Sequence, residues 1–479
     1  MGRSGRVVAG AAGMVAVAIV LVTVVAVIGA VGVPGASVGA AGSPAPVAAV
    51  TSVPSPAISA PSVPGSPAPS ASSSASPSPS PSPSSGSGSP PASPSPLPDP
   101  SAVPAERLQA LLDRLRARSF VPGVSVAILW DDGRRWLGAS GLRDVAGGLP
   151  MTTDTGFSLA SISKTYTAAV VLELVEEGKL SLDRPVALLL PAFHLDPRIT
   201  LRMLLDHTSG LPDFFMGGGI DAALNKAPDA AWTPMVSWRY LPRAYGVPGK
   251  TWSYSNTNYL LLGEVVQAVT GNALSHEIRV RLLDPLRLGS TWYQVEEPPR
   301  VTLSKGYRLV AVKGGAIRSV SVAPPSDIMP FRSVITAAGG AGSIGSTALD
   351  TARWMQAYAG GRVLRPAMQQ AMLGDLLRTV LRHASVPYGL GIQEVVLAGH
   401  PALGHAGRFL GYRTVVRYLP DVGITIAVLT NQGDYDPAKI AAQLIGVVAP
   451  PARPAPSAPL PSPRTSGSPE PSPSGYAAP

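Results

Sequence analysis

Residues 124–130 read Val-Ser-Val-Ala-Ile-Leu-Trp, and this run of β-branched and apolar residues is typical of a strand. The turn residues Asp131-Asp132-Gly133 follow it and lead into a second strand. Near the other end of the sequence, residues 413–418 and 424–429 are two more β-rich runs, separated by Pro420-Asp421-Val422-Gly423. The centre is richer in helical patterns. The sequence therefore predicts an α+β fold, in which one antiparallel sheet is built from both ends of the domain, is flanked by helices and carries a helical subdomain.

The folded domain is expected to span residues 104–449, between two low-complexity segments. Residues 43–103 are rich in Pro, Ser, Ala and Gly, and residues 450–479 repeat this composition. Such segments bury too little apolar surface to offset the entropy that is lost on ordering. Both are therefore predicted to be a disordered linker and a disordered tail rather than domains.

Residues 1–42 are predicted to be a cytoplasmic stub with a membrane anchor or signal segment. Two arginines within the first six residues precede an uncharged apolar run from Val7 to Val33. This run exceeds the roughly 20 residues that span a bilayer and is long for a signal peptide, so an uncleaved anchor is favoured. Cleavage and secretion are the alternative, since Val38 and Ala40 fit a cleavage site. The charge before the run places the domain on the extracytoplasmic face of the membrane.

Composition excludes several classes of site. The chain has no cysteine, which rules out disulfides, thiol catalysis and thiolate metal sites. Four histidines, His194, His276, His383 and His400, have no motif and no metal-ligand spacing, so no metal or other cofactor is expected. The net charge of +9 comes mainly from scattered arginines without a compact basic run, which argues against nucleic-acid binding.

Ser161-Ile162-Ser163-Lys164 is the only Ser-x-x-Lys sequence in the chain, and it precedes an apolar helical run that stops at Gly178. Residues three apart lie on one helix face, so Lys164 is placed beside the Ser161 hydroxyl. A serine hydroxyl needs a neighbouring base to become a nucleophile, and a partly desolvated lysine can lose its proton and serve as that base. Alone, the motif is weak, because a solvent-exposed helix start produces the same pattern.

Two further motifs follow in the sequence. Tyr254-Ser255-Asn256 precedes another helical run that ends near Gly271, where Asn256 also suits a helix N-cap. His405-Ala406-Gly407 is placed just before the predicted strand at residues 412–418. A lone histidine is more often structural than catalytic, so neither motif decides a function by itself.

Together, the Ser-x-x-Lys, Tyr-x-Asn and His-x-Gly motifs resemble the active-site set of the serine β-lactamase and penicillin-binding protein superfamily. The Tyr-Ser-Asn form resembles the branch of class C β-lactamases, D-alanyl-D-alanine carboxypeptidases and related esterases. Supporting stretches at residues 204–212, 248–252, 339–340 and 346–350 are similar to recurrent family sequences, with Ser346 expected to cap a helix. The resemblance covers essentially all of residues 104–449.

The resemblance implies roles for individual residues. Ser161 is the nucleophile that becomes acylated, Lys164 is its proton partner, and Tyr254 protonates the leaving group. Asn256 binds the substrate amide and holds Lys164. The third motif contributes His405 as a further catalytic residue and Gly407 as a substrate-binding residue, and the oxyanion hole consists of the backbone N–H groups of Ser161 and Arg408. His207 is expected to be structural.

The resemblance leaves the substrate open. A D-alanyl-D-alanine carboxypeptidase acting on cell-wall peptides is preferred, and an esterase or other amidase and a β-lactamase are the alternatives. A catalytically silent surface-binding protein is a further possibility, although a protein that only binds a partner does not require Ser161, Lys164 and Tyr254 together. Arg408 departs from the family, which usually has a small or hydroxylated residue there. Its guanidinium either docks a substrate carboxylate, blocks the pocket or points into solvent.

Overall fold

The computed structural model describes residues 105–243, 245–311, 317–321, 331–380 and 384–451. The predicted anchor or signal segment and the Pro-rich linker lie outside the described residues, as does nearly all of the predicted tail. Within the described ranges, no helix combines the length and the apolar character that a membrane crossing needs.

A seven-stranded antiparallel sheet joins the two ends of the domain, as the sequence predicts. Its strands are β1 (Gly123–Trp130), β2 (Arg135–Asp144), β3 (Leu149–Pro150), β9 (Gln393–Leu397), β10 (His400–Phe409), β11 (Tyr412–Leu419) and β12 (Ile424–Thr430). They lie in the order β3-β2-β1-β12-β11-β10-β9. The central contact is between β1 and β12, where Val126 pairs with Val428. Strands that are about 300 residues apart in the sequence therefore form the middle of the sheet.

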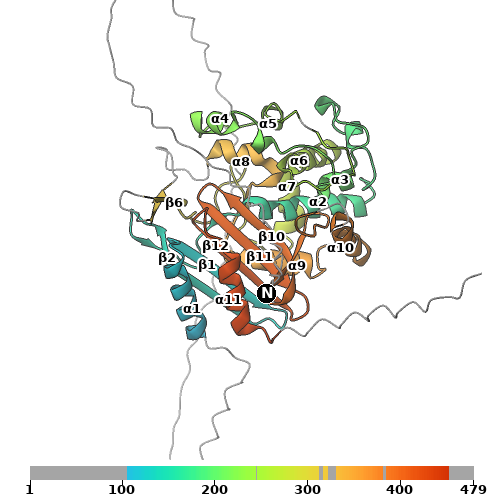
Figure 1. Ribbon diagram of the computed structural model, residues 1–479. Helices are drawn as coiled ribbons and strands as arrows, with labels where there is room; N and C mark the ends of the chain where they lie inside the picture. The colour runs from blue at the N-terminus through green and yellow to red at the C-terminus, as the bar shows by residue number, and fades with distance from the viewer. Residues whose placement is uncertain (1–104, 244, 312–316, 322–330, 381–383, 452–479) are drawn as a thin grey trace, which may run out of the picture. The chain divides into compact units, whose positions relative to one another are not determined.

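Helices cover both faces of this sheet (Figure 1). The helices α1 (Ala105–Arg118) and α11 (Ala438–Val448) pack side by side on one face, and α9 (Ala348–Ala359) packs against β1, β11 and β12. Alternate residues of β1 face opposite layers: Val126 belongs to the core under α1 and α11, and Ala127 to the larger core on the other face. Burial on both faces explains why β1 is an almost continuous apolar run.

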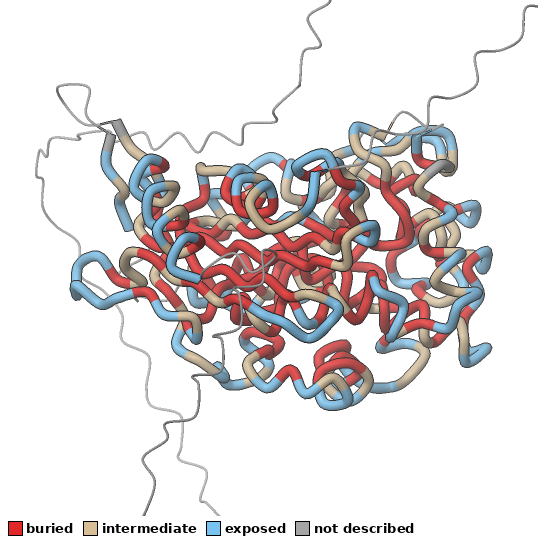
Figure 2. Tube along the Cα trace, turned by 90° about the horizontal axis from the view of Figure 1, so that it is seen from below, coloured by how far each residue is buried: buried red, intermediate tan, exposed pale blue. Residues whose placement is uncertain are grey.

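The helical subdomain lies between the two halves of the sheet in sequence. It contains α2 (Ser163–Glu176), α3 (Leu201–Leu205), α4 (Ile220–Lys226), α5 (Pro234–Trp238), α6 (Asn256–Thr270), α7 (Leu274–Ile278) and α8 (Arg332–Ala338), while α10 (Pro366–Val380) follows α9. Short helical turns are η1 (Ala160–Ile162), η2 (Val186–Leu188), η3 (Pro191–Phe193), η4 (Phe214–Met216), η5 (Arg279–Leu283) and η6 (Gly339–Ala341). Small sheets are formed by β4 (Phe157–Ser158), β5 (Trp292–Tyr293) and β8 (Ile344–Ser346), and by β6 (Tyr307–Ala311) with β7 (Ile317–Ser321). Buried positions concentrate in the sheet and the helices packed on it (Figure 2).

Two local predictions from the sequence are wrong, and one strand was not predicted. The His405-Ala406-Gly407 motif precedes β11, as predicted, but it also lies inside β10, a strand whose β pattern is obscured by Pro401, Gly404 and Gly407. The cap of α9 is Thr347, whose hydroxyl accepts from the Asp350 N–H, while Ser346 ends β8. Asn256 is the first residue of α6 rather than its cap, since its side chain is engaged in the contacts described below.

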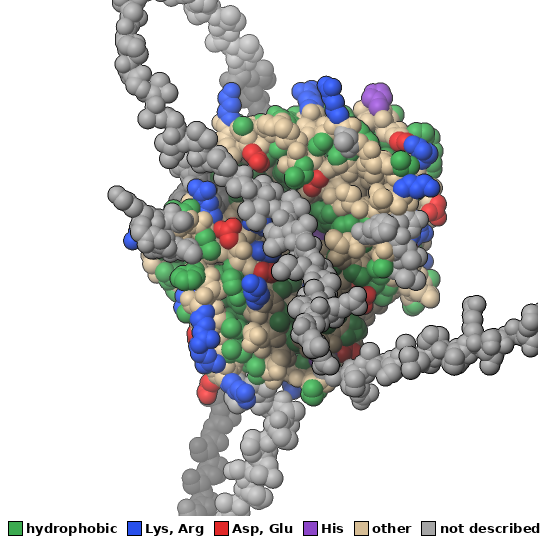
Figure 3. All heavy atoms as spheres, viewed as in Figure 1, with side chains coloured by type: hydrophobic (Ala, Val, Ile, Leu, Met, Phe, Trp, Pro, Cys, Tyr) green, Lys and Arg blue, Asp and Glu red, His purple; other side chains and the backbone are tan. Residues whose placement is uncertain are grey.

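The charged surface agrees with the absence of a basic stretch in the sequence. On the face that Figure 3 presents, lysine and arginine side chains occur in separate small groups among apolar and neutral side chains. Many arginines of the described residues pair with carboxylates, for example Arg279 with Glu297 and Arg281 with Glu177.

Candidate active site

Ser161 and Lys164 lie at the junction of η1 and α2, where the helical geometry brings their side chains together. The Lys164 ammonium nitrogen Nζ donates to Ser161 Oγ over 3.0 Å. Ser161 is partly exposed, while Lys164 is completely buried. Ala160, immediately before the serine, has a φ of 51°, a left-handed conformation that is uncommon for a residue with a Cβ. Such local backbone strain is often found at functional sites.

Lys164 makes two further hydrogen bonds. Its Nζ donates to Asn256 Oδ1 over 2.7 Å and to the Ala341 carbonyl oxygen over 2.9 Å. With Ser161, these acceptors match the three hydrogens of an ammonium group. Burial lowers the pKa of Lys164 to about 7, although the carboxylate of Asp213 acts in the opposite direction. The side chain can therefore exist in either protonation state near neutral pH.

Tyr254 lies against both members of this pair. Its ring centre is 5.0 Å from Lys164 Nζ, and its hydroxyl interacts with the side chain of Ser161. Burial raises the pKa of Tyr254 well above its usual value, and the Ser161 contact only partly offsets this. The phenol therefore keeps its proton at neutral pH and is able to donate it.

His207 packs against the Tyr254-Ser255-Asn256 segment and is hydrogen-bonded to it. Its ring centre is 4.4 Å from that of Tyr254, and its Nδ1 accepts from the Ser255 N–H over 3.2 Å. Burial and the charge of Lys164 lower the pKa of His207 well below its usual value, so the ring is neutral. This packing agrees with the structural role that the sequence predicts.

The Asn256 side chain connects Lys164 to a carboxylate that the sequence analysis missed. Its Nδ2 donates to Asp213 Oδ2 over 2.7 Å, while its Oδ1 accepts from Lys164. Asp213 directly follows the Leu204–Pro212 stretch, but its contact with Asn256 spans 43 positions of sequence. The only sequence signal was its place at the end of a family-like stretch.

His405 is buried and is held as a neutral ring. Its Nδ1 lies 2.6 Å from the Ala406 carbonyl oxygen, which can only accept, so Nδ1 carries the hydrogen. Its Nε2, 2.9 Å from the Tyr388 hydroxyl, then accepts from that group. Burial, assisted by the charges of Lys164 and Arg417, lowers the pKa of His405 to about 3. The ring centre lies 6.4 Å from that of Tyr254, so His405 is beside the site but is hydrogen-bonded to Tyr388 instead of Ser161.

Gly407 lets β10 approach the nucleophile. A Cβ on Gly407 would lie only 2.1 Å from the Leu159 carbonyl oxygen, so no other residue fits beside η1 without a shift. Arg408 follows on the same strand, but its side chain donates to Asp434 Oδ1 over 3.4 Å, and both partners are well exposed. The structure therefore brings together Ser161, Lys164, Tyr254 and Asn256, and it directs the Arg408 guanidinium to an ion pair outside this group.

Residues 108–449 match the protein family described as Beta-lactamase. The chain belongs to the β-lactamase family. It is similar to penicillin-binding protein 4 of Amycolatopsis lactamdurans, at 30% identity over 68% of this chain and 84% of that protein. It is also similar to esterase EstB of Burkholderia gladioli, at 33% identity over 41% of this chain and 53% of that protein.

Solved structures agree with this assignment of the β-lactamase-family chain. D-amino acid amidase from Ochrobactrum anthropi SV3 has a TM-score of 0.61 at 25% identity, covering 72% of this chain and 96% of that one. A D-stereospecific amidohydrolase from Streptomyces sp. has a TM-score of 0.57 at 27% identity, covering 69% and 95%. The large antiparallel sheet with its helical subdomain is thus the β-lactamase and transpeptidase fold.

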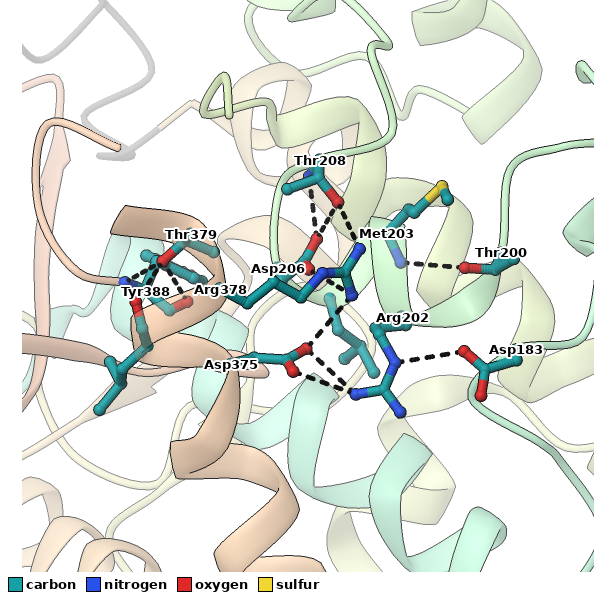
Figure 4. A network of polar contacts seen from close by, with 12 residues as sticks. Asp183, Thr200, Arg202, Met203, Asp206, Thr208, Asp375, Arg378, Thr379 and Tyr388 are labelled. Carbon is teal, nitrogen blue, oxygen red and sulfur yellow. Dashed lines mark hydrogen bonds and ion pairs between the residues drawn. The ribbon is translucent and has the colours of Figure 1, made fainter. Parts of the chain in front are cut away.

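A network of ion pairs supports the site of this family member from the side of α10 (Figure 4). Arg378 lies 3.2 Å from the buried carboxylate of Asp206, the residue before His207. The next residue of α10, Thr379, donates to the Tyr388 carbonyl over 2.8 Å and accepts from its N–H over 2.9 Å. Helix α10 is thereby connected to Asp206, the residue before the His207 that packs on Tyr254. It is also connected to Tyr388, whose hydroxyl faces His405.

Proposed function

We propose that this β-lactamase-family protein is a serine hydrolase that cleaves amide or ester bonds through an acyl-enzyme on Ser161. The observation that carries the proposal is the 3.0 Å contact between Lys164 Nζ and Ser161 Oγ, at a lysine whose pKa burial lowers to about 7. A neutral lysine in this position accepts the serine proton as the Oγ–C bond forms.

Tyr254 completes the proton path. Because its pKa is raised, the phenol serves as a proton donor rather than as a phenolate base. As the tetrahedral intermediate collapses, Tyr254 gives its proton to the leaving nitrogen or oxygen, and Lys164 returns the serine proton to Tyr254. Water then attacks the acyl-enzyme by the reverse sequence of proton transfers and releases the acid. His405 takes no proton in this scheme, since it is neutral and its Nε2 already accepts from Tyr388.

The site favours substrates that are uncharged beside the scissile bond. A carboxypeptidase must bind a free carboxylate, yet His405 is neutral and the Arg408 guanidinium is paired with Asp434. Amides and esters of D-amino acids are therefore the first substrate class of the proposal. The similarity to D-amino acid amidase and to D-stereospecific amidohydrolase supports it.

A D-alanyl-D-alanine carboxypeptidase is the second candidate. The similarity over 84% of penicillin-binding protein 4 favours it. It requires the Arg408 side chain to leave Asp434 and turn toward the substrate. An extracytoplasmic location would suit a cell-wall substrate, and it rests on the sequence of residues 1–42 alone.

Labelling followed by turnover assays tests the proposal. The full-length protein is treated with a fluorescent fluorophosphonate, and the adduct is mapped by peptide mass spectrometry; a single adduct on Ser161 is expected. The same protein is then given D-phenylalanine amide, a p-nitrophenyl ester, a D-Ala-D-Ala peptide and a chromogenic cephalosporin. Higher kcat/KM on the amide and the ester supports the first candidate, and higher kcat/KM on the D-Ala-D-Ala peptide supports the second. No adduct and no turnover would reject the hydrolase.

A further inference from the structure

Asp213 immediately precedes η4 and is separated from Lys164 by one side chain, that of Asn256. Its Oδ1 accepts from the Phe215 N–H over 3.0 Å and so caps the turn. Its Oδ2 accepts from Asn256 Nδ2 over 2.7 Å. Both carboxylate oxygens are therefore used, one to fix the loop and one to reach toward the site.

The Asn256 amide is held in one orientation by its two neighbours. A carboxylate can only accept, so Nδ2 must face Asp213, and an ammonium can only donate, so Oδ1 must face Lys164. Rotating the amide by half a turn would set donor against donor and acceptor against acceptor. The contacts thus form a continuous path from Asp213 through Asn256 and Lys164 to Ser161.

The charge of Lys164 has no direct ionic partner. The side chain is completely buried, and no carboxylate among the described residues forms an ion pair with it. A buried charge is costly unless a counter-charge and hydrogen bonds compensate it. Among the residues that the structure describes, Asp213 is the carboxylate that acts electrostatically on Lys164, and the interaction favours the ammonium form.

The other titratable groups around Lys164 supply no negative charge. Tyr254 and Tyr259 lie with ring centres 5.0 and 5.6 Å from Nζ, and burial raises the pKa of both phenols. His207 and His405 also act on Lys164, and burial lowers the pKa of both rings, so they are neutral. Within the described part of the chain, it is thus Asp213 that offsets the ammonium charge.

We propose that Asp213 is a positioning residue that acts through Asn256: it orients the Asn256 amide and supplies the counter-charge of the Lys164 ammonium. The proposal rests on the proposed function, in which Lys164 is the base that activates Ser161. In the resting enzyme, Asp213 favours the protonated lysine that donates to Ser161. It thereby sets the pH at which the lysine becomes able to accept the serine proton.

The test is the pH dependence of the Asp213→Asn variant. The base must be neutral, so kcat/KM rises with pH through the pKa of Lys164. Removing the carboxylate destabilises the ammonium form, and this lowers the pKa and moves the rising limb to lower pH. A shift of about one pH unit is expected for a charge that acts across one amide group. The exposed Asp196→Asn variant is the matched control, and its limb should stay in place.

A second measurement does not depend on turnover. The pKa of Lys164 is read by NMR titration of protein with 13C-labelled lysine, with the signal assigned from Lys164→Arg. Asp213→Asn should lower this pKa, while the exchanged pair Asp213→Asn with Asn256→Asp should raise it above wild type, because the carboxylate then touches the lysine. The exchanged pair also serves if Asp213→Asn alone fails to fold.

The outcomes separate the two proposals. An unchanged lysine pKa in both variants, or a kcat/KM that falls equally at every pH, would show that Asp213 only braces the loop and would overturn its proposed role. A lysine pKa that shifts as expected in a protein without fluorophosphonate labelling would keep the electrostatic role and reject the hydrolase.

Discussion

Tyr388 fixes the hydrogen-bonding state of His405, with its hydroxyl 2.9 Å from Nε2 while Nδ1 faces the Ala406 carbonyl at 2.6 Å. Both ring nitrogens of the third-motif histidine are thus engaged in hydrogen bonds, and the ring connects β10 to Tyr388. In the proposed mechanism, acid–base chemistry is assigned to Lys164 and Tyr254.

Ser161→Ala should abolish both turnover and fluorophosphonate labelling without loss of fold. The neighbouring Ser163 does not replace it, because its side chain is 1% exposed and its hydroxyl accepts from the Ile344 N–H over 2.9 Å. Peptide mapping of the wild-type adduct and thermal unfolding of the variant check this. An adduct on Ser163, or full labelling of the alanine variant, would show that another residue is the nucleophile.

Lys164→Ala and Tyr254→Phe should each lower kcat by about 10²–10⁴-fold, the usual range for loss of an acid–base group. The double variant should lose far less than the product of the two single losses, because both side chains serve one proton path. Steady-state kinetics on an ester substrate measure all three variants. Rates close to wild type in Tyr254→Phe would mean that the leaving group takes its proton from elsewhere.

His405 should make stability depend on pH in a predictable direction. Its pKa is lowered from 6.5 to about 3 in the folded protein, so below pH 6.5 the unfolded chain binds a proton that the folded chain does not. This contribution to the free energy of unfolding is complete above pH 6.5 and is lost as the pH falls toward 3, by up to about 1.4 kcal/mol per pH unit. Urea unfolding of wild type and His405→Gln at pH 7 and pH 5 measures it. The difference between the two proteins should shrink at pH 5, and a constant difference would contradict a neutral buried ring.

Arg378→Ala should destabilise the protein more than removal of an exposed arginine does. The Asp206 side chain is fully buried, and burial raises its pKa to about 6 despite the opposing charge of Arg378. Removal of the partner of a buried charge costs about 3–5 kcal/mol, and the partial exposure of Arg378 places this site at the low end. Urea unfolding gives the loss, and Asp206→Asn with Arg378→Ala should recover part of it. Arg198→Ala, at the exposed pair with Asp196, is the control and should change little.

Local sequence patterns predicted the parts of the site that depend on helical spacing and strand composition. Ser161 and Lys164 are three residues apart, and one turn of helix is enough to bring them together. The β1 and β12 runs are apolar enough to be recognised as strands, because burial on both faces of a sheet favours a continuous apolar run. These features needed no knowledge of distant contacts.

The missed residues all act through contacts between distant segments. Asp213 and Tyr388 belong to no catalytic sequence motif. Each is linked to the site through a hydrogen bond to one partner, Asn256 or His405. The strand that carries His405 was missed because its glycines permit close approach to η1 rather than favour β structure. Sequence spacing does not reveal such a requirement, because the atom that Gly407 avoids belongs to Leu159.

Arg408→Ala distinguishes the two candidate functions. The guanidinium donates to Asp434 over 3.4 Å, and side chains of both residues are more than a third exposed, so the pair contributes little to stability. If the side chain stays there during turnover, the variant should keep the wild-type ratio of kcat/KM between a D-Ala-D-Ala peptide and a neutral D-amino acid ester within about twofold. If it turns inward to bind a carboxylate, the peptide should lose about tenfold or more while the ester is spared, because a charge-assisted hydrogen bond is worth about 1.5–3 kcal/mol. We expect the unchanged ratio.

Asp434→Asn is the companion variant, since it frees Arg408 without removing it and should leave the ester rate unaltered. A selective loss on the peptide in Arg408→Ala would instead favour the carboxypeptidase.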